Sequence, residues 1–82
     1  MDRANVLVKV RNIIADNLNV GVSKVVEAAN LVNDLGLDSI DGTTLVMAVE
    51  EEFKIETTNE EVGSIRTVKE IVDLIMKKTA GR

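Results

Sequence analysis

Residues 34–53 read DLGLDSIDGTTLVMAVEEEF, and this stretch decides the fold. Asp38 is a preferred helix N-cap residue. Asp41 follows three positions later, where an acidic side chain can return a hydrogen bond to the cap, as in a capping box with Asp in place of Glu. The stretch therefore predicts a helix that runs from Ser39 to Phe53.

The predicted helix has two apolar faces, of which the core needs only one. At roughly 100° of rotation per residue, one apolar stripe faces the core. This stripe comprises Leu45, Val46, Val49 and Phe53. Ile40 and Met47 fall on the opposite side, beside Glu51. An exposed Ile and Met rimmed by acids predict a small docking surface, and the adaptable Met side chain suits a surface that accepts several partners.

A first helix is predicted from the apolar spacing between Asp2, which can serve as its cap, and Leu18. Asn19 ends it. The following residues, 20–38, show no sustained period and predict a long connection with a helical turn near residues 23–27. A connection of this length often marks function.

Two further helices are predicted towards the C-terminus. A short helical turn is capped by Thr58 or Asn59, with Glu61 as the partner in a capping box. The last helix starts at Thr67, with Glu70 three residues later. Its apolar stripe comprises Val68, Ile71, Val72 and Ile75, and Gly81 lies just past its end.

The whole chain, residues 1–82, is predicted to be a single all-α domain. We expect a small antiparallel bundle of three longer helices plus one short helix, with a long loop between the first and second helices. Apolar residues make up 45% and charged residues 29% of the chain, which is a globular balance. The absence of Cys and His removes the usual ligands of zinc, iron–sulfur and haem sites and also the Ser–His–acid triad. No apolar run is long enough to span a bilayer and no signal-peptide core is present, which predicts a cytoplasmic protein.

Acidic residues are concentrated in the middle of the chain. From Asp34 to Glu61 nine acidic residues are opposed by a single lysine, Lys54, which gives a net charge of −8, whereas the whole chain carries −4. Phosphate contacts need clustered Lys and Arg, so this block argues against nucleic acid as a partner. It favours protein partners with basic patches, attracted over long range; a solvated face without a partner is the alternative.

Ser39 lies in the first turn of the predicted central helix, where backbone N–H groups and the helix dipole favour an attached phosphoryl group. The gain for an exposed group is small, ~0.3–1 kcal/mol, and Asp38 and Asp41 oppose it by like charge. A nucleophilic catalyst is not predicted, because the chain has no His and the nearest lysines in sequence are Lys24 and Lys54. An ordinary helix-start serine is the alternative. No EF-hand loop is present, so no metal site is predicted.

The run DLGLDSID, from Asp34 to Asp41, resembles the prosthetic-group attachment site of acyl carrier proteins, in which an Asp-Ser-Leu/Ile motif opens the second helix. The downstream run LVMAVEEEF, residues 45–53, is similar to the rest of that helix in bacterial members. The resemblance extends from Val10 to Ile75. With both runs at their fixed offset in an acidic helical chain, the sequence is identified as a member of this family of discrete phosphopantetheine carriers.

The resemblance implies a carrier that catalyses nothing. Ser39 would bear 4′-phosphopantetheine, donated from coenzyme A by a phosphopantetheinyl transferase, the holo-carrier synthase. The thiol of the arm would hold acyl intermediates of fatty acid, polyketide or specialised lipid biosynthesis as thioesters. The positions that match the family's partner-recognition surface are Asp38, Ile40, Asp41, Met47, Glu50 and Glu51. The expected partners of this monomeric carrier are the transferase and acyl-processing enzymes with basic docking patches.

The sequence departs from the family pattern at several positions. Thr44 and Asn33 stand where an acid is frequent, and Thr43 stands where an apolar residue is usual. The Ile-Pro pair common after the second helix is absent. The recognition face is therefore less acidic and less apolar in its middle than that of a housekeeping fatty-acid carrier. We expect either a divergent fatty-acid carrier or a paralogue that serves a dedicated pathway.

The aliphatic core predicts that the bundle accepts a medium-length acyl chain. Burial contributes ~0.8 kcal/mol per CH₂, so six methylenes contribute ~5 kcal/mol before the cost of opening a cavity. That is comparable with the stability of a small domain, ~5 kcal/mol at the low end. An ordinary core with no room for a chain is the alternative. Two other functions also stay open: an aminoacyl or peptidyl carrier with the same arm, and an unmodified acidic helical adaptor.

Overall fold

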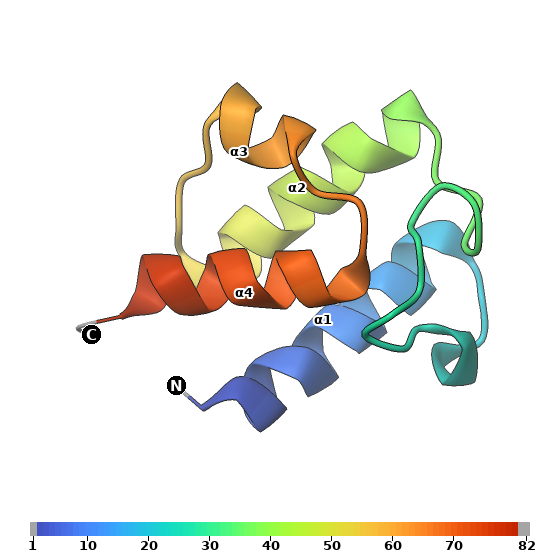
Figure 1. Ribbon diagram of the computed structural model, residues 1–82, viewed down its shortest axis with the longest axis horizontal. Helices are drawn as coiled ribbons and strands as arrows, with labels where there is room; N and C mark the ends of the chain where they lie inside the picture. Colours follow the sequence, from blue (N-terminus) through green and yellow to red (C-terminus); the bar gives the residue numbers. More distant parts are fainter. Residues whose placement is uncertain (1, 81–82) are drawn as a thin grey trace.

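The structure is a computed structural model that describes residues 2–80 and is built from helices (Figure 1). In chain order these are α1 (Arg3–Leu18), the 3-10 helix η1 (Val22–Lys24), α2 (Ser39–Phe53), α3 (Asn59–Gly63) and α4 (Val68–Thr79). Within residues 2–80 the β structure is a single isolated antiparallel bridge between Asn30 and Thr67. The predicted all-α fold with three longer helices, one short helix and a long loop after the first helix is confirmed.

Local capping explains where each helix begins. The side chain of Asp2 accepts a hydrogen bond from the backbone N–H of Asn5, and Asn19 ends α1 in the left-handed conformation with φ of 54°. The other three α-helices each begin with a capping box in which both reciprocal hydrogen bonds are present. The pairs are Asp38 with Asp41, Thr58 with Glu61, and Thr67 with Glu70. All three boxes were predicted, and the structure selects Thr58 over Asn59 as the cap of α3; the predicted Gly81 lies outside the described residues.

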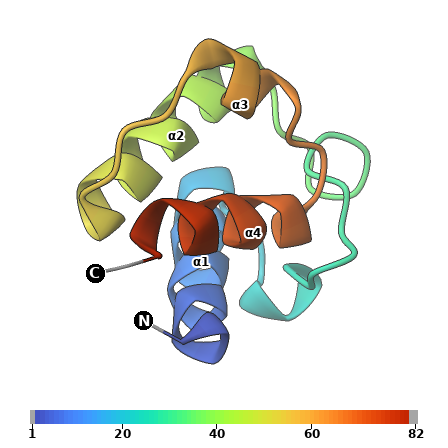
Figure 2. The ribbon, with the colours of Figure 1, turned by 60° about the vertical axis from the view of Figure 1, so that its left-hand side comes forward.

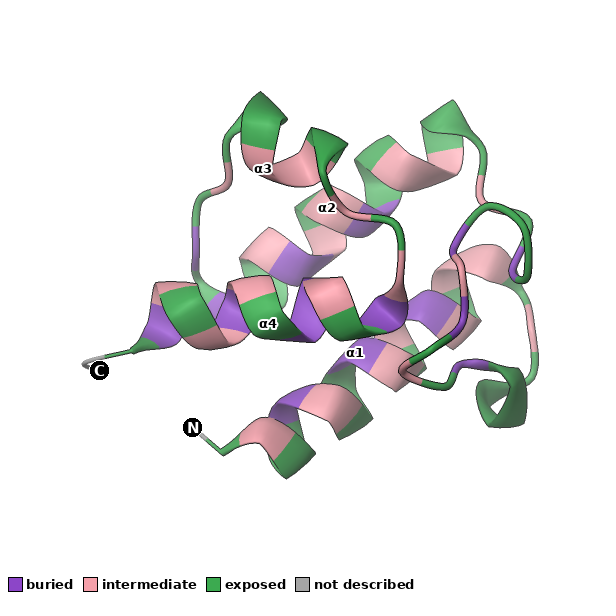
Figure 3. Cartoon of the chain, viewed as in Figure 1, coloured by how far each residue is buried: buried purple, intermediate pink, exposed green. Residues whose placement is uncertain are grey.

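The core lies where α1 packs against both α2 and α4, and α4 crosses α1 in both views of the ribbon (Figure 2). The stripes predicted for α2 and α4 are buried, except that Val46 is half-buried. Figure 3 shows these buried residues on the inner faces of α1, α2 and α4, whereas α3 has no fully buried residue. The short helix is therefore the most weakly held wall of the bundle.

The loop between η1 and α2 is ordered by its own polar side chains. The Oδ1 atom of Asn30 accepts hydrogen bonds from two backbone N–H groups that follow it, and its own N–H donates to Asp34. The N–H of Leu31 donates to the carbonyl of Arg66, which ties the loop to the segment before α4. Gly36 has φ of 75°, a conformation that favours glycine, and turns the chain towards α2. The helical turn predicted near residues 23–27 is observed slightly earlier, as η1.

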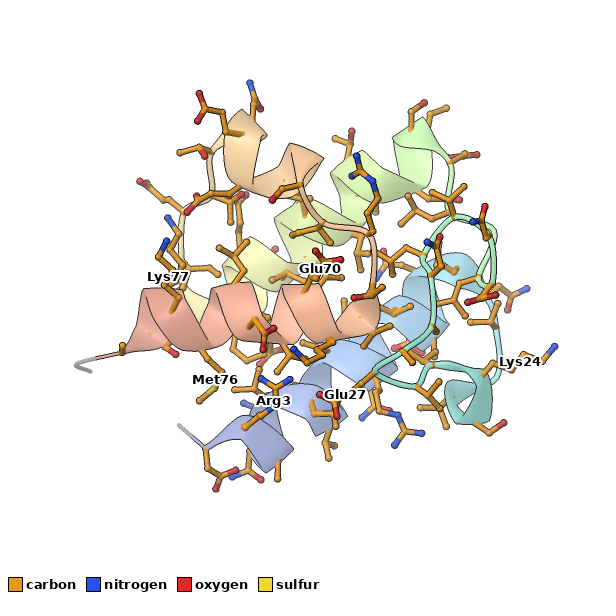
Figure 4. All side chains as sticks on the ribbon, in the orientation of Figure 1. Arg3, Lys24, Glu27, Glu70, Met76 and Lys77 are labelled. Atoms are coloured by element: carbon orange, nitrogen blue, oxygen red, sulfur yellow. The ribbon has the colours of Figure 1, made fainter. Side chains whose placement is uncertain are left out.

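A cluster of charged side chains links the same loop to α1 and α4. The guanidinium of Arg3 on α1 donates to Glu27 in the loop and to Asp73 on α4, each at 2.6 Å. Figure 4 shows the side chains of Arg3 and Glu27 directed towards one another beneath α4. The two carboxylates raise the pKa of Arg3 above its ordinary value. The two charge-assisted hydrogen bonds, one to each carboxylate, link the loop and α4 to α1.

Candidate functional site

Ser39 is the first residue of α2, and its side chain is exposed. The preceding residue, Asp38, accepts a hydrogen bond from the N–H of Asp41 at 2.8 Å, and Asp41 accepts one from the N–H of Asp38 at 3.4 Å. This box fixes the direction in which the helix starts. Ser39 therefore lies on a rigid helix end rather than in a mobile loop, with its hydroxyl open to solvent.

A cavity of about 100 Å³ lies beneath this helix end, between α2, α3 and α4. Thr57 is the one residue with a polar side chain among those that line it. The lining residues are Leu31, Leu37, Gly42, Leu45, Val46, Val49, Thr57, Val62, Ile65, Ile71, Leu74 and Ile75. Such an apolar cavity suits a hydrocarbon rather than water, which needs polar partners.

The lining separates into a buried floor and a half-buried rim. The floor is formed by side chains from the loop, α2 and α4, namely Leu31, Leu45, Val49, Ile71 and Ile75. The rim on the α2 side includes Gly42 and Val46, which are one helical turn apart, and the facing rim includes Val62 of α3 and Ile65. The mouth of the cavity therefore opens between α2 and α3. The lining residues that are nearest to Ser39 in sequence are Leu37 and Gly42.

Comparison with known proteins shows which family this chain is similar to. The family described as "Phosphopantetheine attachment site" matches residues 8–75. An acyl carrier protein of Syntrophobacter fumaroxidans is 48% identical over 80 residues, which cover 98% of this chain and 99% of that protein. One from Thermosynechococcus vestitus is 42% identical over the same length, with the same coverage of both chains. A solved structure of an acyl carrier protein from Enterococcus faecalis matches with a TM-score of 0.81 and 34% identity over 96% of this chain and 100% of that chain.

The chain belongs to the acyl carrier protein family. Acyl carrier proteins hold their cargo on covalently attached 4′-phosphopantetheine, and this chain is a carrier of that kind. No described helix is long and apolar enough to cross a membrane. Among residues 2–80 no group of three or more His, Cys, Asp or Glu side chains could hold a metal ion.

The residues at the start of α2 of this acyl carrier protein fit the prosthetic group. A phosphodiester on Ser39 would lie at the positive end of the helix dipole, beside backbone N–H groups of the first turn. The carboxylates of Asp38 and Asp41 oppose it by like charge, although each is already held by a hydrogen bond in the capping box. The exposed hydroxyl of Ser39 would leave room for such a group, and Gly42, one helical turn away, lines the apolar cavity.

The predicted recognition residues of this acyl carrier protein do not all have the same surroundings. Ile40 is 76% exposed and Met47 is 63% exposed, which confirms that the second apolar face of α2 is open to solvent. Glu51 is also exposed. The carboxylate of Glu50 instead accepts hydrogen bonds at 2.9 Å from both the N–H and the hydroxyl of Thr57. Glu50 thus fixes the segment after α2, and its role towards partners stays a prediction.

Most of the residues at the rim of the cavity were not singled out from the sequence, although Val46 was predicted as part of the core-facing stripe of α2. Leu37, Gly42, Val62 and Ile65 come from four different segments, and the cavity exists only when the fold brings these segments together. Among these residues, only Gly42 is unusual in the sequence itself, because a glycine near the start of a well-capped helix lowers helix propensity.

Proposed function

We propose that this acyl carrier protein is modified at Ser39 by a phosphopantetheinyl transferase and carries acyl chains of fatty acid or related lipid biosynthesis. In the transfer, the Oγ atom of Ser39 forms a bond to phosphorus while the pyrophosphate bond of coenzyme A breaks. Adenosine 3′,5′-bisphosphate leaves, and the hydroxyl proton passes to a base of the transferase. When bound, the group supplies the thiol that holds an acyl chain as a thioester.

The observation that carries the proposal is the exposed Ser39 on a capped helix end, one turn from the mouth of an apolar cavity. The lining favours an acyl chain over aminoacyl or peptidyl cargo, because a charged or polar cargo would lose its hydration there without gaining partners. A cavity of about 100 Å³ is smaller than the roughly 150 Å³ that encloses benzene in an engineered protein. A medium-length chain must therefore separate the helices, and α3 is the wall that can move.

The docking surface in this proposal is the exposed face of α2. Ile40 and Met47 supply apolar contact, and Asp38, Asp41 and Glu51 supply negative charge for partners with basic patches. We propose that the chain forms one domain, because within residues 2–80 the core is continuous from α1 to α4. We also propose that it acts as a monomer in the cytoplasm.

Mass spectrometry tests the proposal. Incubation with coenzyme A and a phosphopantetheinyl transferase of broad specificity should add one phosphopantetheinyl group to the wild-type chain and none to Ser39→Ala. Ser23→Ala is the matched control, because Ser23 is also exposed but lies in η1, and it should be modified like the wild type. A wild-type chain that stays unmodified would contradict the proposal and favour an unmodified adaptor. A modified Ser39→Ala chain would show that the group is attached at another residue.

A further inference from the structure

Gly42 has no backbone reason to be glycine. It lies within α2, and Gly36 is the one glycine among the described residues with positive φ. Its N–H donates to the carbonyl of Asp38 at 2.9 Å, as any residue in this helical position would. Glycine in a helix is less favourable than alanine, so this position lowers the stability of α2 without relieving backbone strain.

Packing against neighbouring backbone does not require glycine either. A Cβ atom at position 42 would lie 3.5 Å from the Cδ2 atom of Leu37, which is an ordinary van der Waals contact. Alanine would therefore fit without a clash. Alanine would instead reduce the open space at the rim of the cavity. Both Gly42 and Leu37 line the cavity there, and both are half-buried.

The space beside Gly42 lies close in sequence to Ser39, the proposed attachment point of the cargo. Gly42 follows Ser39 by three residues, so it is the rim residue of α2 nearest to the attachment point. The next rim residue on the same face, Val46, is β-branched and fills its part of the mouth. An acyl chain on the thiol of an arm attached at Ser39 would pass the gap between Gly42 and Leu37 if it enters the cavity at this end of the mouth.

We propose that Gly42 is a specificity-determining residue that keeps the mouth of the cavity open for the acyl chain, at the expense of helix stability. This inference rests on the proposed function, since it requires a tethered acyl chain that enters the cavity. A methyl group at position 42 would contact Leu37 and close the gap between these two residues. A straight acyl chain of eight carbons would then enter the cavity less deeply.

The test compares melting temperatures of the apo and octanoyl forms of the full chain, with octanoyl-phosphopantetheine loaded at Ser39 and confirmed by mass. Gly42→Ala should raise the melting temperature of the apo form by a few degrees, because alanine is the better helix former. It should also lose at least half of the increase that octanoylation gives the wild type. A residue that matters only for helix propensity would change the first quantity and leave the second unchanged.

Gly63→Ala is the matched control, because Gly63 is also helical, does not line the cavity and has no atom within 4 Å of an added Cβ. This variant should keep the full wild-type increase on octanoylation. An equal increase in Gly42→Ala and wild type would overturn the role of Gly42 and leave the carrier function intact. No increase in the wild type would overturn both the sequestration of the chain and the role of Gly42, while modification of Ser39 would still be judged by mass alone.

Discussion

The carboxylate of Glu61 on α3 lies 2.9 Å from the Nζ atom of Lys78 on α4, and both side chains are about three-quarters shielded from solvent. The Lys78 ammonium is the main reason that the pKa of Glu61 is lowered from its ordinary value, and the hydrogen bond from the N–H of Thr58 adds to the effect. Because α3 contributes no fully buried residue, this ion pair is a principal anchor of α3, the wall that we propose moves when an acyl chain enters.

Replacement of Lys78 by Met removes this anchor while it keeps most of the apolar stem. We expect backbone amides of α3 to exchange with deuterium several-fold faster in Lys78→Met, because local opening of α3 becomes easier. The amides of α4 should be unchanged. Lys77→Met is the control, since Lys77 is an exposed neighbour on the same helix. Equal exchange of α3 in Lys78→Met and wild type would show that apolar contacts alone hold this helix.

The carboxylate of Glu70 predicts a pH dependence of stability. Its Oε1 atom accepts hydrogen bonds from the N–H groups of Arg66 and Thr67 at 2.9 and 3.0 Å. These bonds lower the pKa of Glu70, and the bond from the N–H of Arg66 has the largest effect. A lowered pKa in the folded state means that the contribution is complete above the ordinary glutamate value of about 4.5 and is lost as the pH falls through the lowered pKa.

Urea unfolding of the wild type and of Glu70→Gln tests the direction in which the stability contribution of Glu70 changes with pH. The wild type should be the more stable protein at pH 7, and the difference should shrink steadily below about pH 4.5. The comparison of two chains cancels the repulsion among the other acids, which changes over the same range. A difference that stays constant from neutral to strongly acidic pH would mean that the fold does not hold Glu70 in its charged form.

The helices could be predicted from the sequence because their signals are local. Asp38, Thr58 and Thr67 are each followed three residues later by an acid that completes the box, and all three helices begin there. A cap acts over one turn, so its effect does not depend on the rest of the fold. The exposure of Ile40 and Met47 follows in the same way from the period of a single helix.

The cavity and the contacts of Glu50 could not be predicted, because they depend on how distant segments pack. The resemblance to acyl carrier proteins placed Glu50 with the partner-recognition residues of α2. Its carboxylate nevertheless binds Thr57, since the chain turns back along α2 after Phe53. The cavity likewise depends on where α3 lies, and a five-residue helix with no buried side chain gives little indication of its position in its own sequence.

The exposed face of α2 predicts the effect of removing its apolar side chains on partner binding. Ile40→Ala and Met47→Ala should each raise the KM of the phosphopantetheinyl transferase for this carrier, by about tenfold if the residue loses a contact worth ~1.4 kcal/mol. Neither should change stability by more than ~0.5 kcal/mol, because both side chains are exposed. Val8→Ala is the control, since Val8 is 55% exposed but lies on α1. A KM that rises equally in all three variants would contradict a docking site on α2.

The floor of the cavity predicts a loss of stability that cargo can reverse. Leu45 is 3% exposed and lines the cavity, so Leu45→Ala should destabilise the apo form by about 2–5 kcal/mol. The substitution also enlarges the cavity, and an octanoyl chain should then occupy space that it must otherwise open at a cost. We therefore expect octanoylation to raise the melting temperature of Leu45→Ala by more than it raises that of the wild type.

Leu35→Ala separates this effect from a general response of a weakened fold. Leu35 is 6% exposed but does not line the cavity, so its loss should destabilise the apo form in a similar way. A chain bound in the cavity does not fill the space that Leu35 leaves, and octanoylation should stabilise Leu35→Ala only as much as the wild type. If both variants gained equally, the chain would be acting through the whole bundle rather than through the space between α2, α3 and α4.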